Sequence, residues 1–223
     1  MTKFKICGLS HIDHALAAAD AGADYLGFVF VQGVRRELSI QNATHLIKEY
    51  RCMSGDGGPK LVGLFANQSI QYVNNTVNKV GLDMVQLCGN EPPKYWNDID
   101  VPVIKQIKVK EEGSLQKTIA GITQLAKQVC KNGQIPLLDK YHDGHLGGTG
   151  TKFDWNIAAE ITKTHNIFLA GGLTPENVRD AIRTVTPWGV DVSSGIETDN
   201  TKDTKKIISF AEEVTQANQE ISD

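Results

Sequence analysis

The sequence predicts a (β/α)8 barrel, an α/β fold in which eight parallel strands alternate with eight helices. Eight short apolar runs alternate with helix-type segments along the chain. Most of these runs are continuously apolar, which is typical of parallel strands that are covered on both faces. The length of 223 residues lies within the range of about 200–400 residues that such barrels occupy. Because no linker-like segment divides the chain, we expect one barrel domain over residues 1–223.

The local patterns justify each element in chain order. Ser10 followed by Asp13 approximates a capping box at the start of the first helix, and Thr174 before Pro175 predicts an N-cap and a first helical residue. Gly22 and Gly81 follow helical patterns, where a left-handed C-cap is expected. The eight strands are expected at residues 3–8, 25–30, 60–66, 83–88, 101–107, 135–139, 166–170 and 188–193.

Composition excludes several classes of function. The net charge is −3 and no lysine/arginine block occurs, so we expect neither a nucleic-acid partner nor a membrane partner. No segment approaches the roughly 20 apolar residues of a membrane span, and the N-terminal apolar run is too short for a signal peptide. The four cysteines are widely spread and form no C-x-x-C pair. This argues against a disulfide framework and a zinc site, and favours a cytoplasmic location.

Chemistry-bearing side chains gather at one predicted end of the barrel. In this architecture the site forms from the carboxyl ends of the strands and the loops after them. Cys7 ends the first strand, Arg36 follows the second, and Asp139 and Asp191 lie at the ends of the sixth and eighth. Each has a plain alternative explanation: a small buried thiol, a surface charge, or an aspartate that caps a loop.

Two glycine-containing segments predict a phosphate site. The segments "AGG" (170–172) and "SSG" (193–195) leave the seventh and eighth strands, where barrels of this type bind phosphate. Backbone N–H groups at Gly171, Gly172, Ser194 and Gly195 could approach an anion there, and a helix N-terminus adds a favourable dipole. The alternative is that these glycines serve tight turns only.

Two histidine pairs resemble metal ligands. The segment "HIDH" (11–14) is expected on the opening turn of a helix, where Asp13 serves the cap. The segment "HDGH" (142–145) is expected in a loop without a third convergent ligand. Ligand types without geometry are weak evidence, so we expect no metal at either.

Several longer motifs make the chain resemble the phosphoribosylanthranilate isomerase family of tryptophan biosynthesis. They are "KICGL", "GADYLGFVF", "VQLCGNEPP", "PLLD", "GGTGTKFDW", "LAGGLTPENV" and "GVDVSSGIE", in that order between residues 5 and 197. The resemblance implies an Amadori rearrangement that converts N-(5-phosphoribosyl)anthranilate to a 1-deoxyribulose 5-phosphate. It implies a small phosphoribosyl substrate, no cofactor and no metal, and no pattern specifies an oligomeric state. The family commonly has histidine where this chain has Cys88.

The resemblance also implies roles for four residues. Asp139 would be the general acid that opens the sugar ring, and Cys7 the general base that removes the C2 proton. Arg36 would hold the anthranilate carboxylate, and Asp191 would contact sugar hydroxyls. Independently of the resemblance, Arg35 is expected to point the other way from Arg36 if the loop is extended. A thiol acting as a base near neutral pH needs a lowered pKa, to which the substrate's iminium and the phosphate-binding dipoles could contribute, while an aspartate acting as an acid needs a raised one.

Two other functions share this fold. The histidine-pathway aminoaldose isomerase performs the same rearrangement, but that family resembles a duplicated half-barrel with aspartates after strands one and five. Here the first strand ends in Cys7 and the fifth ends in 106–108, which disfavours it. A non-catalytic phosphosugar-binding barrel is the second alternative, and turnover would distinguish it. Because the first and fourth strands are not neighbours, Cys7 and Cys88 are not expected to form a disulfide.

Overall fold

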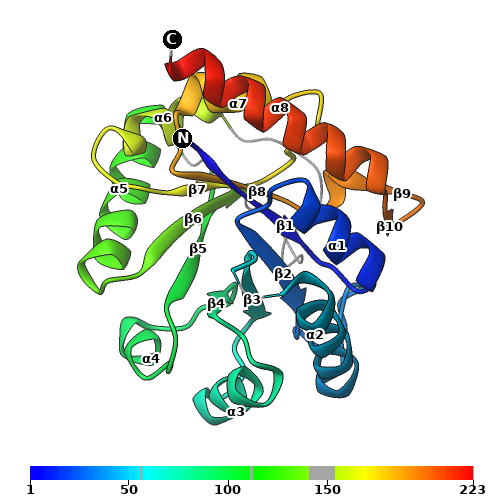
Figure 1. Cartoon of the computed structure of the whole chain (residues 1–223). Helices are drawn as coiled ribbons and strands as arrows, with labels where there is room; N and C mark the ends of the chain where they lie inside the picture. The colour runs from blue at the N-terminus through cyan, green and yellow to red at the C-terminus, as the bar shows by residue number, and fades with distance from the viewer. Residues whose placement is uncertain (56, 111–112, 141–153, 223) are drawn as a thin grey trace.

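The computed structural model describes residues 1–55, 57–110, 113–140 and 154–222, and it confirms the predicted barrel. Eight parallel strands pair in sequence order, and β8 returns to β1, with Lys5 opposite Asp191 in the register. Helices surround the strands (Figure 1). The strands are β1 (Lys3–Cys7), β2 (Tyr25–Val29), β3 (Lys60–Phe65), β4 (Met84–Leu87), β5 (Val103–Val109), β6 (Ile135–Lys140), β7 (Phe168–Leu169) and β8 (Gly189–Val192).

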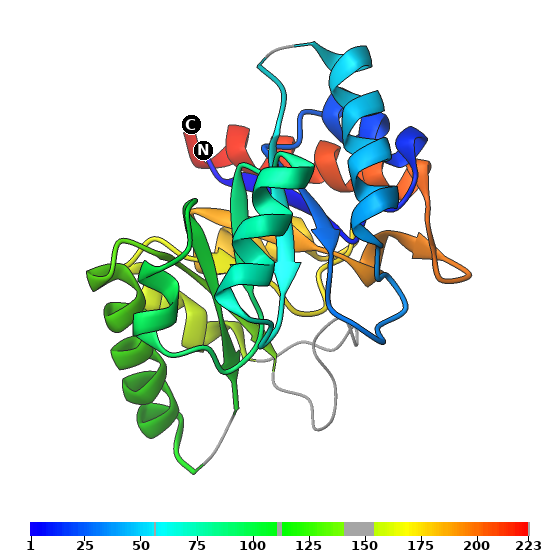
Figure 2. The ribbon, with the colours of Figure 1, turned by 90° about the horizontal axis from the view of Figure 1, so that it is seen from below.

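The helices follow the strands as expected, and one small hairpin is added after β8. A 3-10 turn, η1 (Ser194–Ile196), leads into the antiparallel pair β9 (Glu197–Thr198) and β10 (Thr201–Lys202). This hairpin and the loop after β2 lie on the same side of the molecule (Figure 2). The helices are α1 (Ile12–Asp20), α2 (Ile40–Ser54), α3 (Ile70–Val80), α4 (Pro93–Asn97), α5 (Leu115–Lys131), α6 (Trp155–Thr162), α7 (Val178–Val185) and α8 (Thr204–Ser222).

Apolar side chains pack on both faces of the barrel wall. One cluster fills the space between strands and helices, and a smaller one lies inside the barrel, with Val62, Ile104, Leu137 and Phe168 among its members. Because both faces are buried, the strands need apolar residues at successive positions, and every residue of β2 is buried. This explains the continuous apolar runs in the sequence. Among the described helices, none is long and apolar enough to cross a membrane.

Two of the predicted helix starts are wrong. Helix α1 has His11 at its N-cap with no side-chain cap bond, so Ser10 lies outside the helix and no capping box forms. Helix α7 begins at Val178, one turn later than predicted. There the side chain of Asn177 accepts a hydrogen bond from the Thr174 N–H and donates one to the carbonyl of Gly172, which ties the preceding residues into a separate turn.

The predicted helix ends agree with the structure. Gly81 is the C-cap of α3 with a φ of 79°, in the left-handed region that favours glycine. Gly22 follows the end of α1 with a φ of 87°. At the other end of the chain, the Asn218 side chain of α8 pairs with the backbone of Thr2 through two hydrogen bonds of 2.7 and 2.9 Å. This contact holds the last helix against the start of β1.

Candidate active site

Cys7, Asp139 and Asp191 all lie at the carboxyl ends of barrel strands, as predicted. Cys7 is the last residue of β1, and its side chain belongs to the cluster inside the barrel. Asp139 is the last residue but one of β6, and Asp191 lies in β8 beside β1. All three are buried. Asp191 acts electrostatically on both Cys7 and Asp139, so the three side chains share one neighbourhood.

A lysine to which the sequence patterns assign no role lies beneath Cys7. Lys5 is two residues earlier in β1, so it faces the same side of the wall, and its side chain is fully buried. Its Nζ lies 2.7 Å from Oδ1 of Asp191. Burial alone would lower the pKa of Lys5, but Asp191 and Cys7 raise it above its usual value, so the ammonium stays charged. Asp191 is therefore engaged in a buried ion pair.

The surroundings of Cys7 keep its thiol protonated in the free protein. Burial raises the pKa of Cys7, and the Asp191 carboxylate adds to that rise. Lys5 and Lys202 act in the opposite direction, but the pKa remains above its ordinary value. The lowered pKa that a base at neutral pH needs is thus not a property of the protein alone.

The Asp139 carboxyl has the raised pKa predicted for an acid. Its Oδ2 accepts a hydrogen bond of 2.7 Å from Nε2 of Gln106, and its Oδ1 accepts one of 2.9 Å from the backbone N–H of Lys140. Burial and the Asp191 carboxylate raise the pKa of Asp139 to about 6, against the opposing effects of these two bonds and of Lys108. The group can therefore hold a proton close to neutral pH.

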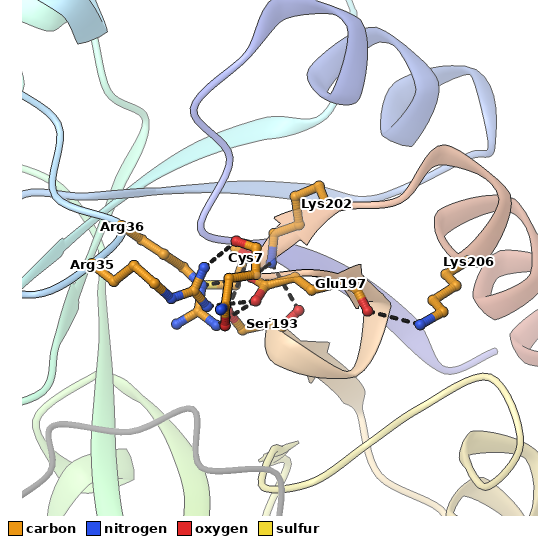
Figure 3. A network of polar contacts seen from close by, with 8 residues as sticks. Cys7, Arg35, Arg36, Ser193, Glu197, Lys202 and Lys206 are labelled. Carbon is orange, nitrogen blue, oxygen red and sulfur yellow. Dashed lines mark hydrogen bonds and ion pairs between the residues drawn. The ribbon is translucent and has the colours of Figure 1, made fainter.

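Arg36 is present after β2 as predicted, but it is already paired. Its Nε lies 2.7 Å from Oε1 of Glu197 and one terminal nitrogen lies 3.0 Å from Oε2, which forms a two-bond fork (Figure 3). Arg35 donates to the same carboxylate at 2.5 Å and also to the carbonyl of Asn200. The prediction that Arg35 points the other way is wrong. Residues 32–36 turn rather than run extended, so successive side chains do not alternate.

Through its hydrogen bonds, Glu197 connects the loop after β2, which carries Arg35 and Arg36, to the ends of β8 and β1. Burial alone would raise the pKa of Glu197, but hydrogen bonds from Arg36, Lys202 and Arg35 lower it to about 2. Lys202 also donates to the carbonyl of Ser193 at 2.8 Å, and the Ser193 hydroxyl donates to the carbonyl of Cys7 at 3.2 Å (Figure 3). Three cations therefore surround one carboxylate beside Cys7, which leaves an excess of positive charge for an anion.

The predicted phosphate-binding segments pack directly against each other. Gly171 and Gly172 have φ values of 90° and 68°, which favour glycine. A Cβ added at Gly195 would lie 1.8 Å from the carbonyl oxygen of Leu173, so only glycine fits beside the β7 loop. Ser194 and Gly195 form the start of η1. The backbone conformation and the close packing at these glycine positions therefore require glycine. Segment 170–172 lies beside Asp139, because a Cβ at Gly171 would lie 3.0 Å from its Oδ1.

Neither a disulfide between Cys7 and Cys88 nor, among the described residues, a cluster of metal-ligating side chains is present. Cys7 and Cys88 are both buried and free, which confirms that they form no disulfide. His11 and His14 contact each other edge to face, and no cluster of three or more metal-ligating side chains occurs among the described residues. The second histidine pair, in segment 142–145, and residues 147–153 of the "GGTGTKFDW" motif lie outside the described residues.

The sequence patterns predicted no role for four side chains that contact or act on the candidate site residues: Lys5, Gln106, Glu197 and Lys202. Lys5 could have been found, because strand alternation places it on the same face as Cys7. Glu197 lies within the quoted "DVSSGIE" motif. Gln106 and Lys202 carry no local pattern that marks them, because their partners are distant in the sequence or lie across the hairpin.

Comparison with known proteins gives one consistent result. Residues 4–213 match the family model described as N-(5'phosphoribosyl)anthranilate (PRA) isomerase. The chain is 41% identical over 217 residues to N-(5'-phosphoribosyl)anthranilate isomerase of Dehalococcoides mccartyi, which covers 97% of both chains. It is 40% identical over 209 residues to that of Roseiflexus castenholzii, which covers 92% of this chain and 94% of the relative.

Solved structures agree with the sequence relatives. The phosphoribosyl anthranilate isomerase of Thermotoga maritima superimposes with a TM-score of 0.83 at 30% identity, covering 97% of this chain and 100% of that one. A second structure of such an isomerase has a TM-score of 0.80 at 30% identity, with the same coverage. That protein is in complex with reduced 1-(o-carboxyphenylamino)-1-deoxyribulose 5-phosphate.

Proposed function

The chain belongs to the N-(5'-phosphoribosyl)anthranilate isomerase family, and on that premise we propose that Asp139 and Cys7 carry out its two proton transfers. The protein is an aldose-ketose isomerase of tryptophan biosynthesis that acts on a small phosphoribosyl substrate. The observation that carries the proposal is a pair of buried ionisable groups at the carboxyl ends of two barrel strands, both linked electrostatically to Asp191.

Asp139 acts first, as the general acid. It donates its proton to the ring oxygen of the ribose, the C1–O bond breaks, and the nitrogen lone pair forms a C=N bond, which leaves an open-chain iminium cation. Asp139 ends this step as a carboxylate. Its pKa of about 6 supports the role, because a group near the working pH can both hold and release a proton.

Cys7 acts second, as the general base. Its thiolate removes the proton from C2, and the electrons of that C–H bond neutralise the adjacent iminium to give an enolamine, which tautomerises to the ketone. The iminium raises the acidity of C2–H and also favours the thiolate beside it. Lys5 supports the same ionisation from below. Because the pKa of Cys7 is raised in the free protein, the thiol releases its proton to water once ring opening has placed the iminium cation beside it, and the resulting thiolate is the base.

Arg36 binds the anthranilate carboxylate in this proposal. A guanidinium has five N–H donors, of which the fork to Glu197 uses two, so donors remain for a second carboxylate. Glu197 holds Arg36 in a fixed orientation, and Asp191 contacts the sugar hydroxyls. The phosphate is bound by the backbone at Gly171, Gly172, Ser194 and Gly195. The excess positive charge around Glu197 supports the binding of a substrate with two anionic groups, a carboxylate and a phosphate, at this end of the barrel.

A crystal structure with the reduced product analogue tests this arrangement. We expect the phosphate on the backbone N–H groups of residues 171–172 and 194–195, the ring carboxylate on Arg36, and C2 of the sugar next to Sγ of Cys7. An analogue whose phosphate lies on the opposite side of the barrel mouth, or whose C2 lies away from Cys7, would contradict the proposed roles.

We also place the enzyme in the cytoplasm. All four cysteines are free, with Cys52 exposed to solvent, and free thiols persist most readily in a reducing compartment. Fractionation of cells that express the chain would test this location, and recovery in an extracytoplasmic fraction would contradict it.

A further inference from the structure

Gln106 is a buried polar side chain inside the barrel that directly contacts the proposed acid. It lies in β5, opposite Leu137 of the neighbouring strand β6, and is 7% exposed. Its Nε2 donates to Oδ2 of Asp139 at 2.7 Å. Its Oε1 is buried and has no hydrogen-bond partner among the described residues. A buried acceptor without a partner is destabilising, so the presence of this amide beside Asp139 calls for an explanation.

The two hydrogen-bond partners of Asp139 differ in the protonation states of its carboxyl group that they can bond. The backbone N–H of Lys140 can only donate, so it can bond Oδ1 only as an acceptor. The side-chain amide of Gln106 carries a donor at one end and an acceptor at the other. A half-turn about its last side-chain bond exchanges these ends. The amide can thus donate to the carboxylate, and its oxygen can accept from the protonated acid.

We propose that Gln106 is a positioning residue that hydrogen-bonds the Asp139 carboxyl in both of its protonation states, donating to the carboxylate and accepting from the acid. The proposal rests on the assignment of Asp139 as the general acid. During turnover Asp139 loses its proton and must regain one, so a partner that fits only one state would be lost in the other. The unpartnered Oε1 is the end of the amide that serves the protonated state.

The same contact limits the pKa of Asp139. Asp191 of β8, itself paired with Lys5, raises that pKa, while Lys108 of β5 and the Gln106 amide lower it. Replacing Gln106 by a residue without an amide removes one of the groups that lower the pKa of Asp139, so burial and Asp191 should raise that pKa further. The amide bonds the charged carboxylate more strongly than it bonds the protonated acid, because hydrogen bonds to charged groups are stronger than neutral ones. Its loss therefore removes more stabilisation from the carboxylate, and the midpoint of the Asp139 titration should rise by about 1 pH unit.

Gln106→Met tests this, because methionine has similar length and neither donor nor acceptor. The carboxyl of Asp139 is titrated by its infrared band, taken as the difference from Asp139→Asn in the same background. We expect the midpoint to rise from about 6 in the parent to about 7 in Gln106→Met. An unchanged midpoint would overturn the proposal.

Gln86→Met is the matched control. Gln86 is buried in the adjacent strand β4 and also has an Oε1 without a partner among the described residues, but its Nε2 faces the sulfur of Cys88 at 3.5 Å. Its replacement removes an equivalent buried amide and should leave the Asp139 midpoint unchanged. An equal shift in both variants would mean that general loosening of the barrel, not the Gln106 contact, moves the titration.

A measurement on the unmodified enzyme covers the case in which Gln106→Met does not fold. The side-chain amide resonances of Gln106 should shift with pH at the midpoint of Asp139, because the amide exchanges its donor for its acceptor. Amide resonances that do not change through that midpoint would overturn the proposal.

Turnover separates this inference from the function on which it rests. If Asp139→Asn stayed active while the Gln106 amide followed the Asp139 titration, the proposed acid would be wrong and the contact would stand.

Discussion

Cys7 and Asp139 open onto the same end of the barrel, but their polar neighbours differ in kind. Ammonium groups act on the thiol, from Lys5 beneath it and from Lys202 of the hairpin after β8. Neutral N–H groups of Gln106 and of the Lys140 backbone bond the carboxyl. A base needs cations so that its negative form can be reached. The two hydrogen bonds to Asp139 lower its pKa, but burial and Asp191 outweigh them, so the carboxyl can still hold a proton close to neutral pH.

The two buried aspartates make the same contrast. Asp139 and Asp191 are both 9% exposed, yet only Asp191 forms an ion pair with a buried lysine. A buried lysine paired with Asp139, as Lys5 is paired with Asp191, would lower the pKa of Asp139 further than Lys108 does and weaken it as an acid. The position of Lys5, next to Asp191 and below Cys7, therefore helps to separate the two roles.

Loss of the thiol should have the largest effect. Cys7→Ala removes the proposed base and should lower kcat by about 10³–10⁴-fold. The melting temperature should stay within a few degrees, because the side chain is small. Steady-state assays that follow the fluorescence of the anthranilate substrate, generated in situ, measure the loss. A variant with more than a tenth of the parent turnover would mean that Cys7 only fills space.

Asp139→Asn should be nearly as harmful, at about 10²–10⁴-fold in kcat, since it keeps the shape and removes the proton. The affinity for the reduced product analogue, measured by calorimetry, should remain within a few-fold of the parent. Near-normal turnover would reject the assignment of the acid.

The same variant has a pH-dependent effect on stability. Because folding raises the pKa of Asp139 to about 6, the protonated form favours the folded state, and this contribution is lost as the pH rises through 6. Asparagine stays neutral throughout. The melting temperature of the variant relative to the parent should therefore be higher at pH 8 than at pH 4, where the carboxyl is protonated in the folded protein.

Lys5→Met should have an intermediate effect. Loss of the cation raises the pKa of Cys7 further, and turnover at neutral pH should fall by about tenfold or more. Lys105→Met is the matched control, because Lys105 forms an equally short buried pair of 2.7 Å with Glu91 on the opposite side of the barrel. Each variant leaves one buried carboxylate unpaired and should lose about 3–5 kcal/mol of stability. Only Lys5→Met should move the thiolate titration of Cys7 to higher pH, and an equal movement in both would contradict the comparison.

Arg36→Lys should have the smallest effect of the four. Lysine keeps the charge and loses the guanidinium fork, so KM should rise several-fold with little change in kcat. Arg35→Lys is the comparison, since its side chain is 42% exposed against 17% for Arg36, and exposed ion pairs contribute little. If Arg35→Lys were as harmful as Arg36→Lys, the carboxylate would have to be shared between both arginines.

The sequence predicts the barrel well because its evidence is local. Continuous apolar runs follow directly from burial on both faces, and the rule for strand ends then places Cys7, Asp139 and Asp191 together. Errors arose where side chains compete with the backbone pattern. Asn177 forms its own turn ahead of α7, and a turn at residues 32–36 brings Arg35 to Glu197.

The partners of the site residues could not be read from the sequence. Lys5 meets Asp191 across 186 positions, and Gln106 meets Asp139 across 33. These contacts depend on strand register in the closed barrel, which no local pattern specifies. Burial raises the pKa of Cys7, and Lys5 and Asp191 act on it in opposite directions, so the protonated state of this thiol in the free protein could not be read from the sequence either.

Titration of both groups in the free enzyme tests the contrast between them most directly. The carboxyl band of Asp139 is followed by infrared difference against Asp139→Asn, and the thiolate absorbance of Cys7 by difference against Cys7→Ser. We predict a midpoint near 6 for Asp139 and a thiolate that forms only above the usual pKa of a cysteine. An Asp139 already ionised at pH 5, or a Cys7 thiolate at neutral pH without substrate, would contradict this contrast.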